Sequence, residues 1–366
     1  SPLDTEGINY TLSLGTKSYD VFFRSRQVRL YGGVEPMIVL SLLPAMRLGV
    51  DILPGRPVSP DFVANLDRFM DVFCGWFPEF SRIAILGDRA DVEKGTTGGR
   101  VGTFFTGGVD SFYTLSKHRS EITDLVYVHG FDISLDDYPR RKAVSRAVRA
   151  VADRFGKGFV EIETNARRLL KGYTKWGKHG HGVALACIGN LLASTFGRIF
   201  IPSSFHSGAL FPWGSHPETD PLLAGPRISF VHDGCELRRT EKIGFICESE
   251  AVMDHLRVCW NNVEGTYNCG VCEKCLRTMI TLYALGKLGA CRTLPDRIDP
   301  GAVQALLLPY PGERIFARQN IALMDLHGLG SSPIRAALQK AVDRPPWLAL
   351  LFSLFRKQAK KLRRLA

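Results

Sequence analysis

Long apolar runs are absent from this 366-residue sequence. The two longest, residues 37–46 and 347–355, are shorter than the ~20 residues that a membrane-spanning helix needs. The first residues also lack the basic stretch and the following apolar segment of a secretion signal, because Asp4 and Glu6 occupy that region. We therefore expect a cytoplasmic protein without a transmembrane segment.

Acidic residues are fewer than basic ones, and the formal net charge is +11. The last eleven residues, 356–366, hold six lysines and arginines and no acid, so most of the excess lies in a tail. We therefore do not expect a nucleic-acid partner. Leu351, Phe352 and Phe355 fall on one face of a predicted tail helix. This face could dock on the protein itself, on a second copy in a homodimer, on another partner or on a membrane surface.

Internal repeats are also absent, and the pattern of the chain changes twice along its length. Residues 1–97 combine short alternating strands with a helix over 61–77, which predicts an N-terminal α+β accessory domain. A charged, glycine-rich stretch, residues 87–100, is the expected linker. Residues 98–292 form the predicted central domain, and residues 293–366 a helical region that ends in the basic tail.

The central region alternates apolar strand-like runs with amphipathic helices, which predicts an α/β fold with a doubly wound, mostly parallel sheet. Ligands bind such sheets beyond the carboxyl ends of the strands. We expect residues 106–111, 129–132, 164–165 and 203–206 to surround one crevice there. The predicted strands are 101–105, 125–128, 159–162 and 198–202, and the predicted helices are 110–118, 140–155 and 183–196.

A glycine loop, Thr-Gly-Gly-Val-Asp-Ser at residues 106–111, connects the first of these strands to a helix. Gly107 and Gly108 allow a tight turn whose N–H groups can face an anion at the helix N-terminus. Thr106 and Ser111 supply hydroxyls, and Asp110 can cap the helix or bind Mg²⁺. The lysine of a Walker loop is missing. Taken alone, the stretch is also compatible with an ordinary helix-entry turn.

Four of the nine cysteines are clustered: Cys259 precedes Cys269, Cys272 and Cys275, which are separated by two residues each. This spacing is typical of a closed Zn²⁺ site with four thiolates. An iron–sulfur cluster is the alternative, although no Cys-Pro follows as in bacterial ferredoxins.

The glycine loop resembles that of the PP-loop ATP pyrophosphatases, and together with the cysteine cluster it resembles the 7-cyano-7-deazaguanine synthase-like members. The resemblance covers residues 101–277. It implies ATP cleavage between the α- and β-phosphates, adenylation of a carboxylate or carbonyl oxygen on a small molecule, and displacement of AMP by ammonia or an amine. It also implies structural zinc. Lys242, in the segment Arg-Arg-Thr-Glu-Lys, would face the phosphates.

The expected roles follow from this resemblance and from the crevice. Asp110, Ser111 and Lys242 are the predicted catalytic residues. ATP would contact Thr106, Gly107, Gly108, Val109, Asp110 and Ser111 through its phosphates, and Val128, His129, Gly130 and Phe131 through its adenine.

The acceptor substrate is expected to differ from that of the deazaguanine synthases, because residues 214–221 differ from the family's substrate segment. Two other functions stay open. One is sulfur transfer through the same adenylate, which needs a further thiol such as Cys187 or Cys235. The other is a non-catalytic nucleotide-binding module. The candidate substrate residues are Asp132, Ser215, His216, Asp220 and Arg239.

Overall fold

The computed structural model describes residues 6–90, 99–263 and 265–362, and these form two compact units. Unit 1 comprises Ser1–Thr106, Thr114–Ser204 and Leu210–Cys235. Unit 2 comprises Gly107–Tyr113, Phe205–Ala209 and Glu236–Ala366. Each unit therefore combines segments that are distant in the sequence.

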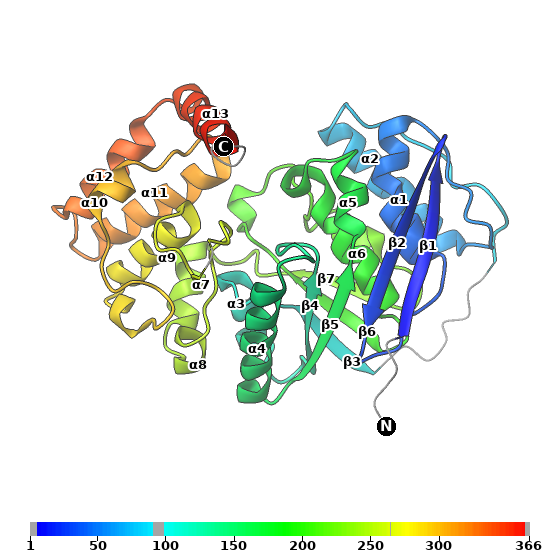
Figure 1. Cartoon of the computed structure of the whole chain (residues 1–366), viewed down its shortest axis with the longest axis horizontal. Helices are drawn as coiled ribbons and strands as arrows, with labels where there is room; N and C mark the ends of the chain where they lie inside the picture. Colours follow the sequence, from blue (N-terminus) through cyan, green and yellow to red (C-terminus); the bar gives the residue numbers. More distant parts are fainter. Residues whose placement is uncertain (1–5, 91–98, 264, 363–366) are drawn as a thin grey trace. The chain divides into compact units, whose positions relative to one another are not determined.

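Unit 1 is built on a seven-stranded sheet of order β1-β2-β5-β4-β3-β6-β7 (Figure 1). The five strands from β5 to β7 in this order are parallel, and the hairpin of β1 and β2 joins them antiparallel through β5. The order turns back at β3, so the topological switch point lies between β3 and β6. The strands are β1 (Glu6–Leu14), β2 (Lys17–Ser25), β3 (Arg100–Phe104), β4 (Asp124–His129), β5 (Gly158–Thr164), β6 (Phe196–Pro202) and β7 (Ser229–Asp233).

Helices complete unit 1, and their ends follow local rules. α4 begins after Asp137, whose side chain accepts a hydrogen bond from the Arg140 N–H, and ends at Gly156 in the left-handed conformation. α3 starts in the unit 2 segment Gly107–Tyr113 and ends in unit 1. The helices are α1 (Glu35–Leu48), α2 (Pro60–Trp76), α3 (Val109–Lys117), α4 (Tyr138–Phe155), α5 (Ala166–Lys171) and α6 (His181–Leu191), with short turns η1 (Trp176–Gly180) and η3 (Asp220–Leu223).

The N-terminal residues share the hydrophobic core of the sheet. One buried cluster includes Phe23 of β2, Leu40 of α1 and Phe69 of α2 together with Val160 of β5 and Ile188 of α6. This arrangement differs from the predicted boundary, in which residues 1–97 formed an accessory domain. Amphipathic patterns show that a segment buries one face, but they do not show against which partner it does so.

Two element boundaries also differ from those predicted. The helix expected over residues 183–196 ends at Leu191, and Phe196 instead begins β6, where it pairs with Arg100 of β3. β7 was not predicted, although its apolar residues Phe230 and Val231 are typical of a short buried strand. The predicted linker falls largely on residues 91–98, which lie outside the described residues.

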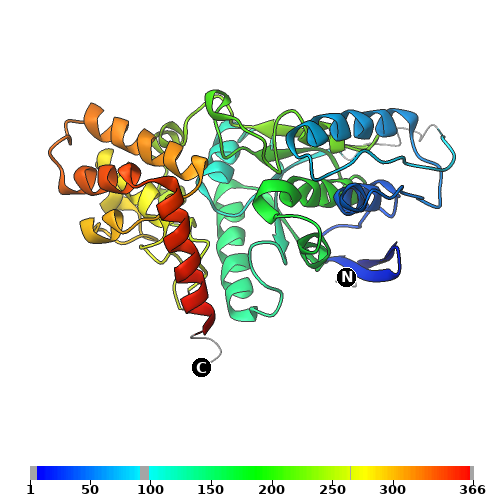
Figure 2. The same cartoon turned by 90° about the horizontal axis from the view of Figure 1, so that it is seen from above.

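Unit 2 is helical apart from its loops, as predicted for the C-terminal region. Four of its helices begin at a proline, the residue that best tolerates the first helical position. α13, red in Figure 2, projects from the orange helices and exposes Trp347 and Phe355. No described helix is long and apolar enough to cross a membrane. The helices are α7 (Arg239–Ile246), α8 (Glu250–Met253), α9 (Glu273–Ala284), α10 (Pro300–Gln304), α11 (Pro311–Leu326), α12 (Pro333–Asp343) and α13 (Pro346–Leu362), with turns η2 (Ser207–Ala209) and η4 (Leu288–Ala290).

Candidate functional site

The glycine loop enters α3 through a turn that requires glycine. Gly107 has φ +75°, which favours glycine, and its carbonyl accepts a 2.7 Å hydrogen bond from the Arg257 N–H. The Ser111 hydroxyl donates to the Gly108 carbonyl at 3.0 Å. The loop is therefore fixed by its own backbone and by the segment that leads to Cys259.

Asp110, in the first turn of α3, is the centre of a buried charge cluster in unit 2. One carboxylate oxygen accepts from the Arg239 guanidinium at 2.8 Å, and the other accepts from the Lys242 ammonium at 3.4 Å. Lys242 is only 1% exposed and Arg239 only 7%. α7 supplies both cations, three residues apart on one face of the helix.

A third cation, Arg277 of α9, adds to this cluster and was not predicted to belong to it. Its guanidinium lies 4.2 Å from the ring centroid of Phe316 and pairs with Glu273 at 3.3 Å. Burial alone would raise the pKa of Asp110, but Arg239, Lys242 and Arg277 outweigh it and lower that pKa. Asp110 is therefore held as a carboxylate.

The charges of the Asp110 cluster are suited to a further anion. Arg239 and Lys242 place two positive charges on one carboxylate, beside the N-terminus of α3. The Nε atoms of Arg239 and Arg277 are buried without a hydrogen-bond partner. Buried donors of this kind are costly unless a ligand or water satisfies them. Both oxygens of Asp110 face cations, so the carboxylate as placed is not a suitable Mg²⁺ ligand.

The four clustered cysteines converge in unit 2, where their sulfur atoms lie within 4.8 Å of one another. Cys269 and Cys275 have sulfurs 4.0 Å apart, as do Cys259 and Cys272. Zinc–sulfur bonds of about 2.3 Å in a tetrahedron place sulfurs about 3.8 Å apart. Hydrogen bonds, chiefly from Cys275, lower the pKa of Cys272 to about 5. The cluster can therefore hold a single metal ion such as zinc.

Asn268 and Gly270 shape the loop around these sulfurs. The Asn268 side-chain oxygen accepts from the N–H groups of Val258 (2.9 Å) and Cys259 (3.0 Å), and its nitrogen donates to the carbonyls of Leu256 and Thr293. Gly270 has φ +71°, and a Cβ there would lie 2.7 Å from Pro295. Asn268 was not predicted to contribute; its position next to Cys269 was the only available signal.

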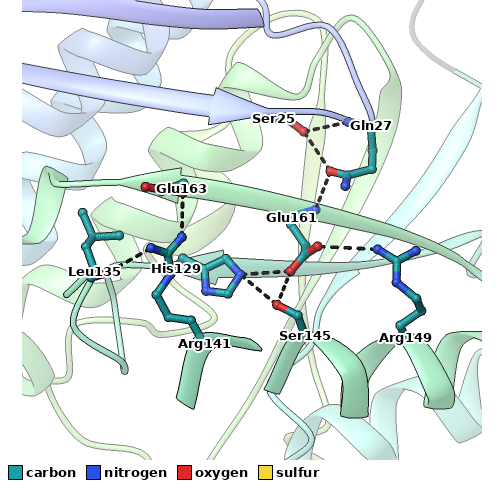
Figure 3. A network of polar contacts seen from close by, with 9 residues as sticks. All are labelled: Ser25, Gln27, His129, Leu135, Arg141, Ser145, Arg149, Glu161 and Glu163. Atoms are coloured by element: carbon teal, nitrogen blue, oxygen red, sulfur yellow. Dashed lines mark hydrogen bonds and ion pairs between the residues drawn. The ribbon is translucent and has the colours of Figure 1, made fainter. Parts of the chain in front are cut away.

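The residues predicted to contact adenine, 128–131, lie at the end of β4 and directly after it, in unit 1. One of them, His129, belongs to a polar network (Figure 3). His129 meets Glu161 at 2.9 Å, and Ser145 donates to the same carboxylate oxygen. Burial would raise the pKa of Glu161, but hydrogen bonds from His129 and Ser145 lower it. Gln27, two residues after β2, accepts from the Glu161 N–H and so ties the segment that follows β2 to β5. The side chain of His129 is thus engaged in holding the sheet together.

The residues that follow His129 form a tight bend. Gly130 has φ +97°, and a Cβ there would lie 1.9 Å from the Thr164 carbonyl oxygen. The carbonyl of Phe131 accepts a hydrogen bond from Arg167, and the Phe131 ring packs edge-on against Trp176. The backbone of this bend therefore lies against the end of β5, and this close approach requires glycine at position 130.

The predicted substrate residues Ser215, His216 and Asp220 do meet, around η3 of unit 1. Asp220 is fully buried and accepts from the Ser215 hydroxyl at 2.6 Å and from the His216 N–H at 3.2 Å. It also bonds His232 Nδ1 at 2.7 Å, a partner that was not predicted. Val128, His129, Gly130, Phe131, Asp132 and Thr106 also lie in unit 1, whereas Gly107, Gly108, Val109, Asp110, Ser111, Arg239 and Lys242 lie in unit 2.

Comparison of the chain with protein-family models, with curated proteins and with solved structures finds no match. The fold and the clusters nevertheless define a class. The chain is an α/β protein with a seven-stranded, mostly parallel sheet and a four-cysteine cluster able to hold a metal ion.

Proposed function

We propose that this protein is an ATP-dependent enzyme that adenylates a carboxylate or carbonyl oxygen of a small molecule, with ammonia or an amine then displacing AMP. The observation that carries the proposal is the Asp110 cluster. Two buried cations, Arg239 and Lys242, lie on a carboxylate in the first helical turn after a glycine loop. Fixed positive charge beside a helix N-terminus is suited to a polyphosphate.

The chemistry requires stabilisation of a leaving pyrophosphate. The substrate oxygen attacks the α-phosphorus of ATP, the bond to the bridging oxygen breaks, and its electron pair leaves with pyrophosphate. Loop N–H groups, Arg239 and Lys242 would neutralise the charge that develops there. The amine then attacks the activated carbon, and AMP leaves. Asp110 holds the two cations in place, and Ser111 holds the loop through Gly108.

The described residues fit zinc better than they fit Mg²⁺. Asp110 would have to release its cations to ligate Mg²⁺, so the proposed reaction assigns no role to Mg²⁺ at this carboxylate. The cysteine cluster fits zinc, which we propose is structural, because four thiolates leave no open coordination position. A cluster of several iron atoms would place the sulfurs farther apart than a single ion does. Metal analysis that finds about one zinc per chain supports this assignment, and iron with visible absorbance contradicts it.

Exchange of labelled pyrophosphate into ATP tests the reaction directly. The full-length protein is incubated with ATP, labelled pyrophosphate and a panel of carboxylates, with ammonia or hydroxylamine added in a second series. We expect acceptor-dependent exchange and, with the amine, release of AMP and pyrophosphate. Formation of ADP and phosphate contradicts adenylation. Tight ATP binding without exchange for any acceptor favours the non-catalytic nucleotide-binding module. The cytoplasmic location and the homodimer are predictions that this experiment does not test.

A further inference from the structure

A cysteine, a histidine and an aspartate meet in unit 1, apart from the Asp110 cluster. His232 is the penultimate residue of β7, Cys235 follows that strand by two residues, and Asp220 begins η3. Ser203 follows β6, the neighbouring strand on the side of the switch point. Carboxyl ends of strands next to a switch point are where α/β sheets bind ligands. These side chains therefore lie in a favourable place for chemistry.

Asp220 fixes the imidazole of His232. Its carboxylate is fully buried, and His232 Nδ1 lies 2.7 Å from one of its oxygens. The Ser215 hydroxyl and the His216 N–H bind the same carboxylate, so it is already oriented before His232 meets it. Because Asp220 engages Nδ1, the remaining ring nitrogen, Nε2, is the one left to exchange a proton with a third group.

The strand geometry points His232 toward η3. Adjacent residues of a strand face opposite sides of the sheet. Asp233 is anchored on one side, where its carboxylate accepts from Thr114 at 2.7 Å and from Lys117 at 2.8 Å. His232 consequently faces the other side, where its side chain is 4% exposed. The Asp233 contacts thus hold the end of β7 in register.

Cys235 lies three residues after His232, close enough for its thiol to affect the pKa of that imidazole, and the thiol donates a hydrogen bond to the Ser203 hydroxyl at 3.3 Å. Burial would lower the pKa of His232, but the hydrogen bonds to Asp220 and Cys235 outweigh it and raise that pKa to about 9. Burial chiefly lowers the pKa of the nearby His216, and the charge of His232 adds to this. An imidazolium beside a thiol stabilises the thiolate, which is the nucleophilic form.

The other two thiols of unit 1, Cys187 and Cys74, have different surroundings. Cys187 is fully buried in α6, and burial raises its pKa. Cys74 of α2 is partly exposed, as Cys235 is, but burial raises its pKa, which Arg82 only partly offsets and Asp71 raises further. Of the two thiols considered for chemistry, Cys187 and Cys235, the partly exposed Cys235 is the one that also contacts a histidine.

We propose that Cys235 is a nucleophile that accepts an acyl group from an ester, a thioester or another activated acyl compound. His232 is its general base, and Asp220 is the residue that positions His232. His232 holds the proton of the thiol as an imidazolium, and the electron pair of the thiolate sulfur forms a carbon–sulfur bond to the acyl carbon. The bond from that carbon to the leaving group breaks, and the leaving group departs with the electron pair and takes the proton from His232. The inference rests on unit 1 alone and does not depend on the use of ATP.

Alkylation of the unmodified full-length protein tests the thiol first. The protein is treated with a limiting amount of iodoacetamide, without chelator or nucleotide, between pH 5 and 10, and each cysteine is quantified by peptide mass spectrometry. We expect Cys235 to react at least about tenfold faster than Cys74 at pH 7, because Cys74 lacks the histidine. The Cys235 rate should persist well below the ordinary thiol pKa. Equal rates for the two thiols over the whole pH range overturn the proposal.

Acylation with p-nitrophenyl acetate tests the function. We expect one acetyl group on Cys235, a matching burst of nitrophenolate, and loss of both in Cys235→Ser but not in Cys74→Ser. His232→Gln should lower the acylation rate by about 100-fold. Asp220→Asn should shift the pH profile of Cys235 alkylation toward higher pH, which a loss of stability alone does not do. An acetyl group placed elsewhere, or unchanged rates and pH profiles in folded His232→Gln and Asp220→Asn, contradict the assignment.

Discussion

Two carboxylates, Asp110 in unit 2 and Asp220 in unit 1, each lie at the first turn of a helical segment and hold basic side chains. Asp110 binds an arginine and a lysine, Arg239 and Lys242. Asp220 binds His232, a side chain whose charge can change. The same acidic group is therefore suited to two different chemistries, depending on its basic partner. Fixed cations suit anion binding, whereas a histidine suits proton transfer.

The largest effect is expected for the four-cysteine cluster of unit 2, which we propose holds a structural zinc ion. Cys272→Ser should abolish tight zinc binding, because apparent binding free energies of structural zinc reach about 10–16 kcal/mol and are coupled to folding. The measurement is metal content by mass spectrometry together with thermal unfolding. Cys291→Ala, a buried cysteine of the same unit outside the cluster, is the control. Retention of a full equivalent of zinc by Cys272→Ser would disprove the assignment.

The second-largest effect is expected for the stability contribution of His232, the titratable partner of Asp220. The pKa of His232 is raised from 6.5 to about 9. Its contribution to the free energy of unfolding is therefore fully present below about pH 6.5 and is lost as the pH rises through 9. That contribution is on the order of 3 kcal/mol, given about 1.4 kcal/mol per pKa unit. Urea unfolding of the wild type and His232→Gln at pH 6 and pH 10 should show the stability difference shrinking at pH 10. A stability difference that grows with pH would contradict the predicted direction of this pH dependence.

A smaller effect is expected for the fixed cations of Asp110. Lys242→Met should weaken ATP binding by about 10- to 100-fold, because a hydrogen bond to a charged group contributes about 1.5–3 kcal/mol. Isothermal titration with ATP measures it, and Lys287→Met, an exposed lysine of unit 2 paired with Glu248, is the control. Equal ATP affinity of both variants would remove Lys242 from the phosphate site.

The smallest effect belongs to a third carboxylate, Glu161, whose partners we regard as structural (Figure 3). Ser145→Ala removes one hydrogen bond to Glu161 and should lower the free energy of unfolding by about 1 kcal/mol. ATP binding and Cys235 alkylation should stay unchanged. Ser18→Ala, at an exposed hydroxyl of β2, is the reference for urea unfolding. A change in ATP affinity with Ser145→Ala would indicate that this network also serves the nucleotide.

The individual strands and helices were predicted from local sequence patterns. β3, α3, β4 and α4 lie within a few residues of their predicted bounds, because apolar spacing and the Gly156 stop report directly on local conformation. The boundary between α6 and β6 was misplaced because Phe196 suits either element and only its pairing with Arg100 decides. The N-terminal segments were assigned to a separate domain because local patterns do not show which other segments they pack against.

The candidate sites divide in the same way. The spacing of Cys269, Cys272 and Cys275 indicated a metal cluster because these ligands are close in the chain. Arg277 could not be assigned to the Asp110 cluster, since more than 160 residues separate the two in the sequence. Asp220 was expected to face a substrate, but its bond to His232 requires that η3 pack beside β7.

The sequence by itself determined the strands and helices of the central region, the glycine turn before α3, and the convergence of the clustered cysteines. Each of these depends on backbone preferences or on ligands a few residues apart. The tertiary structure alone decided that β1 and β2 extend the main sheet, that Asp110 meets Arg239 and Lys242, and that Asp220 meets His232 beside Cys235. These contacts join segments that only strand order and helix packing bring together, and the charge state of each group follows from its neighbours in space.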